Sequence, residues 1–239
     1  MRVALIGYGK MGRAIYEILK QRQHEVVLII DQDNLADRTT EKLKAADVAI
    51  EFTGPEAAPE NIRACLDAGV AVVSGSTGWL AHLPEMEARC NAVHGAMICA
   101  TNFSLGVNIF FEINRRLASL MSGFPDYKVQ IEETHHTAKK DAPSGTAITL
   151  AEQVLGEIQR LKAWENQSTD QKDLLPILSF RQDPAPGTHR VVYHSAIDDI
   201  EIIHTAHNRT GFALGAVLAA EFIIGKKGIF SMRDVLGIG

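Results

Sequence analysis

Apolar runs of four or five residues alternate with segments of helical periodicity through the first hundred residues of this 239-residue chain. Runs that are rich in β-branched residues and apolar on both faces are typical of a parallel sheet covered by helices on both sides. The predicted strands are Val3–Ile6, Val26–Ile30, Val48–Phe52, Val70–Ser74 and Ala96–Ala100. The helices expected between them include Met11–Gln21, Pro59–Asp67 and Leu83–Cys90. This pattern predicts a doubly wound α/β domain.

Small, polar or acidic residues follow each of these five strands. They are Gly7–Gly12, Asp31, Thr53–Gly54, Gly75–Gly78 and Thr101–Asn102. Turn chemistry would explain any one of these loops, but the ligands of open α/β sheets bind at the carboxyl ends of the strands. We therefore expect the five loops to meet at one binding site.

The first of these loops has the spacing Gly7-x-Gly9-x-x-Gly12 and opens a helix directly after a strand. Glycines at this spacing let the backbone turn tightly and approach a pyrophosphate at the helix N-terminus. Asp31 ends the second strand about 20 residues further on, where a carboxylate can accept hydrogen bonds from ribose hydroxyls. The motif alone is a weak signal, but this context favours a Rossmann-type dinucleotide site over a plain turn.

The pattern changes after Asn102. A helix, an alternating strand and a second helix are followed by three strands spaced like an antiparallel meander. These elements are helix Val107–Ser122, strand Lys128–Thr134, helix Ser144–Leu161, an exposed loop at Lys162–Asp173, strands Ile177–Arg181, Arg190–Ser195 and Ile200–Ala206, and a closing apolar helix Phe212–Ile224. We predict that residues 103–207 form an α+β substrate domain with a mostly antiparallel sheet. Residues 1–102 and 208–239 are expected to form the dinucleotide-binding domain.

The segment Glu132–Ala147, EETHHTAKKDAPSGTA, joins the alternating strand to the helix after it. Polar residues on a loop between rigid elements are where catalytic groups gather. Neighbouring strand residues face opposite sides, so we expect one of His135 and His136 to be buried and the other exposed. Lys139 is the better candidate for a proton donor if a partly buried site lowers its pKa, whereas Lys140 is expected to be solvated.

The helix start at Ser144-Gly145-Thr146 has two interpretations. Ser144 can serve as an N-cap alone, after the helix-start proline Pro143. The amides and hydroxyls of the same turn can also hold an anion, aided by the helix dipole. Because the histidines and Lys139 lie close by in the sequence, we favour the second interpretation, a site for a substrate carboxylate. Arg209 is either a salt-bridge residue at a helix start or a second carboxylate clamp, and we favour the structural role.

Composition narrows the class of protein. The formal net charge is -5 and hydrophobic residues make up 46% of the chain. Without a long basic run, neither a nucleic-acid surface nor a polybasic membrane patch is expected. The sequence also contains no apolar stretch of membrane-spanning length and no signal-peptide core at its N-terminus, so we expect a cytoplasmic protein.

The cysteines and histidines give little indication of a metal site. The three cysteines lie far apart in apolar or helical patterns and are predicted to be reduced structural thiols. Most histidines fall at scattered strand positions, where they are expected to fill sheet faces, so we expect no bound metal. The residues concerned are Cys65, Cys90, Cys99, His189, His194, His204 and His207.

Together these residues resemble the dihydrodipicolinate reductase (4-hydroxy-tetrahydrodipicolinate reductase) family of lysine and diaminopimelate biosynthesis. The family signature E-x-H-H-x-x-K-x-D-x-P-S-G-T-A is matched from Glu133 to Ala147. The likeness spans nearly the whole chain and includes Lys10–Arg13, Glu51–Thr53, Gly75–Gly78, Asn102–Asn108 and Gly187–His189.

The resemblance implies roles for individual residues. It implies His135 as catalytic acid/base, Lys139 as proton donor, and His136 with Gly145 and Thr146 as substrate-binding residues. The implied cofactor contacts are Gly7, Tyr8, Gly9, Lys10, Met11, Gly12, Asp31, Gly75, Ser76, Thr77, Ala100, Thr101, Asn102 and Phe103. The implied reaction reduces the cyclic, imine-bearing dicarboxylate formed from 4-hydroxy-tetrahydrodipicolinate to tetrahydrodipicolinate, with NADH or NADPH. Members of the family are commonly homotetramers joined through the sheet of the second domain.

Two departures from the family pattern concern the cofactor. The segment from Asp31 to Val48 is shorter than usual, and Gln32 stands where members that use NADPH commonly have arginine. Asp31 would repel a 2′-phosphate, and Lys10 is the nearby cation that could offset this repulsion. We therefore expect use of both nucleotides with a preference for NADH. The alternatives are a non-catalytic dinucleotide sensor, which would have no use for Lys139, and another small-substrate dehydrogenase.

Overall fold

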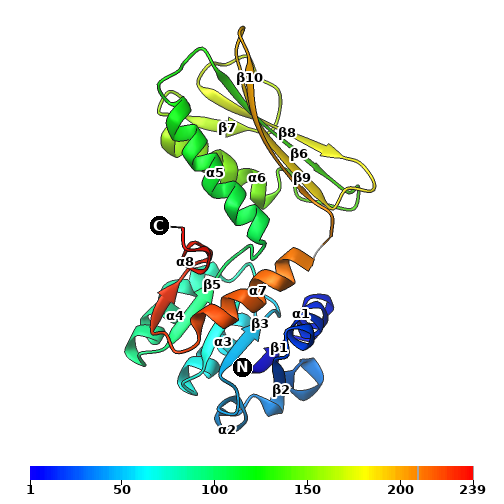
Figure 1. The fold of residues 1–239 in the computed structure, drawn as a ribbon, viewed down its shortest axis with the longest axis vertical. Helices are drawn as coiled ribbons and strands as arrows, with labels where there is room; N and C mark the ends of the chain where they lie inside the picture. The colour runs from blue at the N-terminus through cyan, green and yellow to red at the C-terminus, as the bar shows by residue number, and fades with distance from the viewer. Residues whose placement is uncertain (209, 239) are drawn as a thin grey trace. The chain divides into compact units, whose positions relative to one another are not determined.

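A computed structural model describes residues 1–208 and 210–238 of the chain (Figure 1). The chain forms two compact units. Unit 1 contains Met1–Leu105 together with the C-terminal segment that begins at Thr210, and unit 2 contains the residues between them. None of the described helices is long and apolar enough to cross a membrane.

Unit 1 is built on a six-stranded parallel sheet with the order β11-β5-β4-β3-β1-β2. The strands are β1 Arg2–Ile6, β2 Glu25–Ile30, β3 Val48–Glu51, β4 Ala71–Ser74, β5 Ala96–Cys99 and β11 Gly228–Phe230. The five predicted strands are confirmed. Because β2 and β3 lie on opposite sides of β1, the strand order reverses there. A crevice at the carboxyl ends of the strands is expected at such a reversal.

Helices cover both faces of this sheet (Figure 1). Their bounds are α1 Lys10–Gln21, α2 Thr40–Leu43, α3 Ala58–Asp67, α4 Leu83–Ala92, α7 Thr210–Ile223 and α8 Met232–Leu236, with 3-10 turns η1 Gln32–Asp37 and η2 Leu80–His82. Successive residues of β1 enter opposite cores: Val3 and Leu5 pack with α1 and α7, whereas Ala4 and Ile6 pack with α2, α3 and α4. Each large apolar side chain buried in this way contributes roughly 1.5–3 kcal/mol. The two cores hold the strand ends rigidly.

Unit 2 is a five-stranded sheet with helices on one face (Figure 1). The sheet order is β10-β9-β6-β8-β7. The elements are α5 Leu105–Met121, β6 Lys128–His135, α6 Gly145–Glu157, β7 Ala163–Glu165, β8 Leu174–Arg181, β9 Gly187–His194 and β10 Asp199–Ala206. Val129, Ile131 and Tyr193 pack under the helices. The alternate residues of these strands face away from the helices.

The sheet of unit 2 is mixed, which corrects the expected meander. β9 pairs antiparallel with β6 and β10, as expected. β8, however, runs parallel to both β6 and β7. The reason is that α6 lies between β6 and β8 in the chain, and a crossover helix returns the chain to the same end of the sheet. β7 lies in the segment predicted as a loop, and β11 pairs with β5 in the C-terminal tail.

Candidate active site

The glycine turn of unit 1 allows only glycine at two of its positions. Gly7 has φ +93°, and a Cβ there would lie 2.1 Å from the carbonyl oxygen of Phe52. A Cβ on Gly12 would lie 2.1 Å from the carbonyl oxygen of Gly7. A Cβ on Gly9, by contrast, would meet no heavy atom within 4 Å. The turn is therefore packed tightly on the protein side and open above the N-terminus of α1, which is the shape a pyrophosphate requires.

The end of β2 is fixed by side-chain hydrogen bonds. Asp31 Oδ1 accepts from the amide of Gln32 at 3.0 Å, and Asn34 Oδ1 accepts from the amide of Asp31 at 2.7 Å. Asn34 also donates to the carbonyl of Ile29 at 2.9 Å. The Asp31 carboxylate is thus held at the carboxyl edge of the sheet, one strand away from the glycine turn.

The loops after β3 and β4 are joined by a buried carboxylate that the sequence reading gave no role. Glu51 is fully buried and accepts hydrogen bonds from the amide of Thr53 at 3.0 Å, from Ser76 Oγ at 2.9 Å and from Ser74 Oγ at 2.5 Å. Ser76 Oγ also accepts from the Thr53 amide at 2.8 Å. The predicted cofactor residue Ser76 therefore uses its hydroxyl within the protein.

The other predicted cofactor residues differ in exposure. A Cβ on Gly75 would lie 2.1 Å from the ring of Phe52, so this position also tolerates no side chain. Phe103 is buried, and its carbonyl oxygen would lie 1.7 Å from a Cβ on Gly215 of α7. The remaining positions are partly or fully exposed: Tyr8, Lys10, Met11, Thr77, Ala100, Thr101 and Asn102. Exposed and half-buried side chains at this edge remain available to a ligand.

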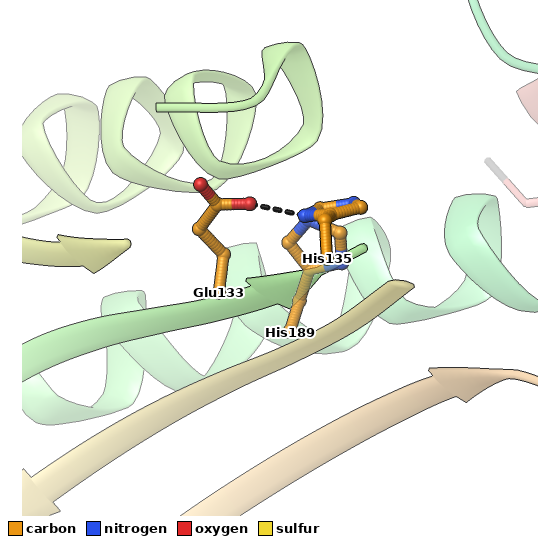
Figure 2. A group of neighbouring side chains, drawn as sticks. All are labelled: Glu133, His135 and His189. Atoms are coloured by element: carbon orange, nitrogen blue, oxygen red, sulfur yellow. Dashed lines mark hydrogen bonds and ion pairs between the residues drawn. The ribbon is translucent and has the colours of Figure 1, made fainter. Parts of the chain in front are cut away.

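In unit 2 the end of β6 carries a buried cluster of Glu133, His135 and His189 (Figure 2). Glu133 and His135 are two residues apart on one strand and share a face. A Glu133 carboxylate oxygen contacts His135 Nδ1 directly. His189 on β9 lies beside them, with its ring centroid 5.1 Å from that of His135. A Cβ on Gly187 would lie 3.0 Å from His135 Nε2, so glycine leaves room at that nitrogen.

The protonation states in this cluster follow from its surroundings. Burial opposes ionisation of Glu133, but contacts with His135, Ser179 and Arg181 outweigh it and lower the pKa of Glu133 to about 2. Glu133 is therefore an acceptor at neutral pH, so the His135 nitrogen that faces it must carry a proton. Burial and then the nearby His135 lower the pKa of His189 to about 3, which keeps His189 neutral.

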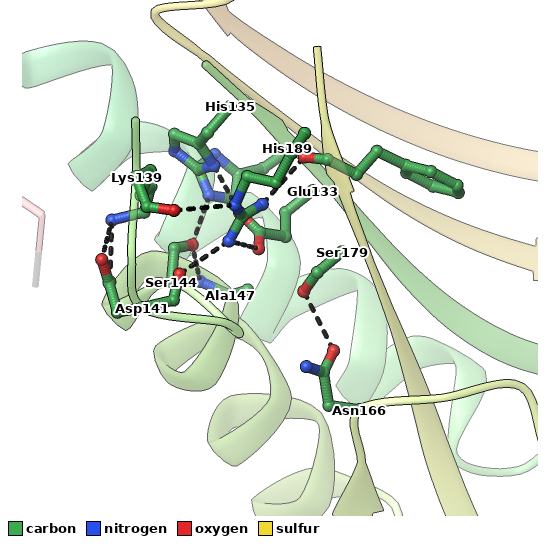
Figure 3. Close-up of polar contacts among 11 residues, drawn as sticks. Glu133, His135, Lys139, Asp141, Ser144, Ala147, Asn166, Ser179 and His189 are labelled. Atoms are coloured by element: carbon green, nitrogen blue, oxygen red, sulfur yellow. Dashed lines mark hydrogen bonds and ion pairs between the residues drawn. The ribbon is translucent and has the colours of Figure 1, made fainter. Parts of the chain in front are cut away.

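Lys139 lies in the loop that follows β6. Its ammonium contacts both carboxylate oxygens of Asp141, at 2.8 and 2.7 Å (Figure 3). The hydrogen bonds from Lys139 lower the pKa of Asp141. His135 is buried, whereas His136 is half-buried and not exposed as expected. Lys140 is exposed, as expected.

Helix α6 begins at the predicted Ser-Gly-Thr turn. Ser144 Oγ accepts from the amide of Ala147 at 3.2 Å, and it lies 3.0 Å from His189 Nε2 (Figure 3). Ser144 is thus the N-cap of α6, as the first of the two interpretations of this turn expected. The amides of Gly145 and Thr146 belong to the first turn, where the helix itself provides no acceptor. The cap joins this helix start to the histidine cluster.

Arg181 is the residue that the sequence reading missed. It ends β8 and pairs in register with His135. Its Nη2 donates to Glu133 Oε1 at 2.9 Å and to the carbonyl of Asp141 at 2.6 Å. Nothing local in the sequence indicates this contact, because 48 residues separate Arg181 from Glu133. The pairing of Glu133 with His135, in contrast, could have been found from their i, i+2 spacing on an alternating strand.

The cluster also has the composition of a metal site. One ligand atom from each of Glu133, His135 and His189 lies within 4.8 Å of the others. The sequence reading did not foresee this convergence of two histidines. Arg181 already supplies positive charge to Glu133, however, and a Glu133 carboxylate oxygen and His135 Nδ1 already contact each other. These contacts favour a hydrogen-bonded acid/base site over a metal ligand set.

Fold and site together define a pyridine-nucleotide-dependent oxidoreductase: a Rossmann-type unit with a glycine turn, and a second unit with a buried Glu-His-His cluster beside a helix N-terminus. The family models for the dihydrodipicolinate reductase N-terminus and C-terminus match residues 1–103 and 106–236. The chain belongs to the dihydrodipicolinate reductase family.

Curated relatives and a solved structure agree with this assignment. The chain is 50% identical over 236 residues to 4-hydroxy-tetrahydrodipicolinate reductase of Christiangramia forsetii, covering 99% of this chain and 98% of the relative. It is 36% identical to the enzyme of that name from Methanoregula boonei, covering 82% and 76%. A dipicolinate-bound dihydrodipicolinate reductase from Paenisporosarcina sp. TG-14 has the same fold, with a TM-score of 0.79 at 23% identity and 98% coverage of both chains.

Arg209, which the sequence analysis interpreted as a salt-bridge residue or a carboxylate clamp, lies outside the residues that the structure describes.

Proposed function

We propose that the chain carries out the reaction of its family with His135, Lys139 and the start of α6 as the working groups of unit 2. The reaction is the NAD(P)H-dependent reduction of the cyclic dicarboxylate derived from 4-hydroxy-tetrahydrodipicolinate to tetrahydrodipicolinate, in lysine biosynthesis. The observation that carries the assignment of roles is the buried Glu133–His135 pair beside the N-terminus of α6.

Substrate binding needs groups for two carboxylates. Gly145 and Thr146 offer the amides of a helix N-terminus, which favour an anion through their hydrogen bonds and the helix dipole. We assign one carboxylate to this turn, with His136 and Ser144 beside it. The relative from Paenisporosarcina sp. TG-14 binds dipicolinate, a planar ring with two carboxylates, which supports this class of ligand.

Proton transfer follows from the charges around His135. Reduced nicotinamide supplies a hydride when it is bound, and hydride addition leaves negative charge on the substrate ring as a carbanion or enamine. An acid must then deliver a proton to carbon. Glu133 holds the His135 ring through Nδ1, and Nε2 lies on the side of Gly187, where the lack of a Cβ leaves that nitrogen uncrowded. Lys139 supplies the second acid and positive charge for the substrate.

The cofactor site of unit 1 accommodates either nicotinamide nucleotide, and we assign the preference to NADH. Asp31 is held rigidly at the end of β2, where its charge suits two ribose hydroxyls better than a 2′-phosphate. Gln32 carries no charge, whereas an arginine there would bind the phosphate through two hydrogen bonds. Lys10 is exposed at the glycine turn and supports some use of NADPH.

The face of the unit 2 sheet that points away from α5 and α6 supports a homotetramer. It carries exposed apolar side chains such as Phe180 and Ile203 together with a groove of about 770 Å³ lined by residues such as Lys128, Gln130 and Arg190. These residues alternate with those that face the helices, so the groove lies on the side opposite His135. We place the enzyme in the cytoplasm with the rest of amino-acid biosynthesis.

The test of this function is oxidation of the cofactor at freshly generated substrate. We expect absorbance of the reduced nicotinamide to fall with both nucleotides, and kcat/KM with NADH to equal or exceed that with NADPH. Asp31→Ala combined with Gln32→Arg should move the preference toward NADPH. Absence of turnover with either nucleotide would overturn the function, and a strong preference of the wild type for NADPH would overturn the account of the adenosine pocket alone.

A further inference from the structure

Arg181 touches both sides of the acid/base site of unit 2. On one side Nη2 donates to Glu133 Oε1 at 2.9 Å, and the second oxygen of that carboxylate contacts His135. On the other side Nη2 donates to the carbonyl of Asp141 at 2.6 Å, and Nε donates to the carbonyl of Lys139 at 3.3 Å. One guanidinium therefore contacts the partner of the histidine and the backbone of the lysine loop.

We propose that Arg181 is a positioning residue that sets the distance and orientation between His135 and Lys139. The proposal rests on the roles given above to these two residues. His135 is carried by a strand, whereas Lys139 is carried by a loop between β6 and α6. A loop on its own does not hold a proton donor at a fixed distance from a strand residue. Arg181 supplies that link from a third element, the end of β8.

The shape of the guanidinium explains why arginine suits this position. Its N–H groups lie in one plane and point along fixed directions, so it can bind a carboxylate and two carbonyl oxygens at once. Nη1 also donates to the carbonyl of Phe180 at 2.8 Å, which fixes the side chain against its own strand. A lysine would keep the charge but would lose the fork that spans Glu133 and the loop.

The charges around His135 balance in this arrangement. Glu133 is negative and faces Arg181. Lys139 is positive and is paired with Asp141, and His189 is neutral because its pKa is lowered to about 3. Removal of the guanidinium leaves the buried Glu133 carboxylate with His135 and Ser179 as its partners, and it removes the two hydrogen bonds that tie the loop to the end of β8. Both changes act on catalytic geometry rather than on nucleotide binding.

Arg181→Met and Arg181→Lys in the full-length enzyme test the proposal. We expect kcat of Arg181→Met to fall on the order of 10²-fold, since misplacement of a catalytic group by about 1 Å has that effect. The dissociation constant for NADH, measured by fluorescence without substrate, should stay within about twofold, because the nucleotide site belongs to unit 1. Added guanidinium chloride at millimolar concentration should restore part of the kcat of Arg181→Met.

The matched control is Arg115→Met on α5, which removes contacts to Glu112 and Glu157 and should leave kcat unchanged.

A second measurement separates positioning from folding. Arg181→Lys retains the charge and is expected to melt close to the wild type, yet its kcat should fall at least tenfold. Arg181→Met combined with Glu133→Gln should lose less than the product of the two single losses, because both act through the same carboxylate. Near-normal kcat in both Arg181 variants, or independent losses without rescue by guanidinium, would overturn the proposal. A wild type without reductase activity would instead overturn the proposed function, and this inference with it.

Discussion

At the scale of single residues, substitution of Lys139 tests the proposed chemistry most directly. Its ammonium is paired with Asp141, an exposed carboxylate, so Lys139→Ala removes the proposed proton donor without leaving a buried charge. We expect kcat to fall on the order of 10²–10⁴-fold, the usual contribution of a positioned acid. The affinity for NADH should remain within about twofold of the wild type. Steady-state kinetics and a nucleotide titration measure the two quantities.

Lys140→Ala is the matched control, since Lys140 is exposed beside the same loop and should be dispensable. Near-normal turnover of Lys139→Ala would make Lys139 a solvated loop residue and remove it from the mechanism.

Residue identities in the site were predictable from the sequence where the signal was local. The helix cap at Ser144, the burial of one histidine of the His135-His136 pair and the solvated Lys140 follow from local sequence, although the pattern did not say which histidine is buried. The surroundings of His135 were not predictable in the same way. His189 and Arg181 reach it through strand pairings whose register no single-sequence pattern specifies.

At the scale of elements, Glu51 couples the loops that follow two neighbouring strands of unit 1. Its partners are hydroxyl and amide donors from Thr53, Ser74 and Ser76. Glu51→Gln would place an NH₂ donor against these donors, which costs about 1–3 kcal/mol for a buried group left unsatisfied. Because both loops lie at the predicted cofactor edge, we expect the dissociation constant for NADH to rise roughly tenfold.

A fluorescence titration with NADH measures this change. Glu56→Gln removes the same charge from an exposed position of the loop after β3 and serves as the control. An unchanged NADH affinity in Glu51→Gln, with only its melting temperature lowered, would show that the carboxylate stabilises the fold without shaping the nucleotide site.

The elements themselves were largely predictable, with instructive exceptions. Five of the six parallel strands of unit 1, β1 to β5, could be recognised because buried strands between helices are short, apolar and β-branched. The three-residue strands β7 and β11 carry too few residues for a period to be read, and each forms by pairing with a longer neighbour. β8 was expected in a meander because its own residues contain no information on the direction of the strand beside it.

At the scale of the whole molecule, the sheet of unit 2 leaves one face without helices. Ile203 and Phe180 on this face have exposed fractions of 56% and 47%. The same face carries an ion network in which Arg190 contacts Glu132 and Glu201. A mixed apolar and charged face of this kind is typical of a surface that a second copy of the chain covers. A closed symmetric assembly would bury the same face on every copy.

The tetramer proposed from this face predicts a specific response to charge. Ile203→Glu replaces an apolar side chain of this face with a carboxylate on the edge strand β10, opposite Arg190 and two residues from Glu201, so burial against another copy becomes unfavourable. We expect sedimentation velocity to give a wild-type mass near four times the chain mass of 26.1 kDa and a smaller species for the variant. The affinity for NADH should be unchanged in that smaller species. Leu120→Glu, at an exposed position on α5 in the helix layer, should leave the assembly intact. A wild-type monomer, or an Ile203→Glu variant that still sediments as a tetramer, would place the interface elsewhere or remove it.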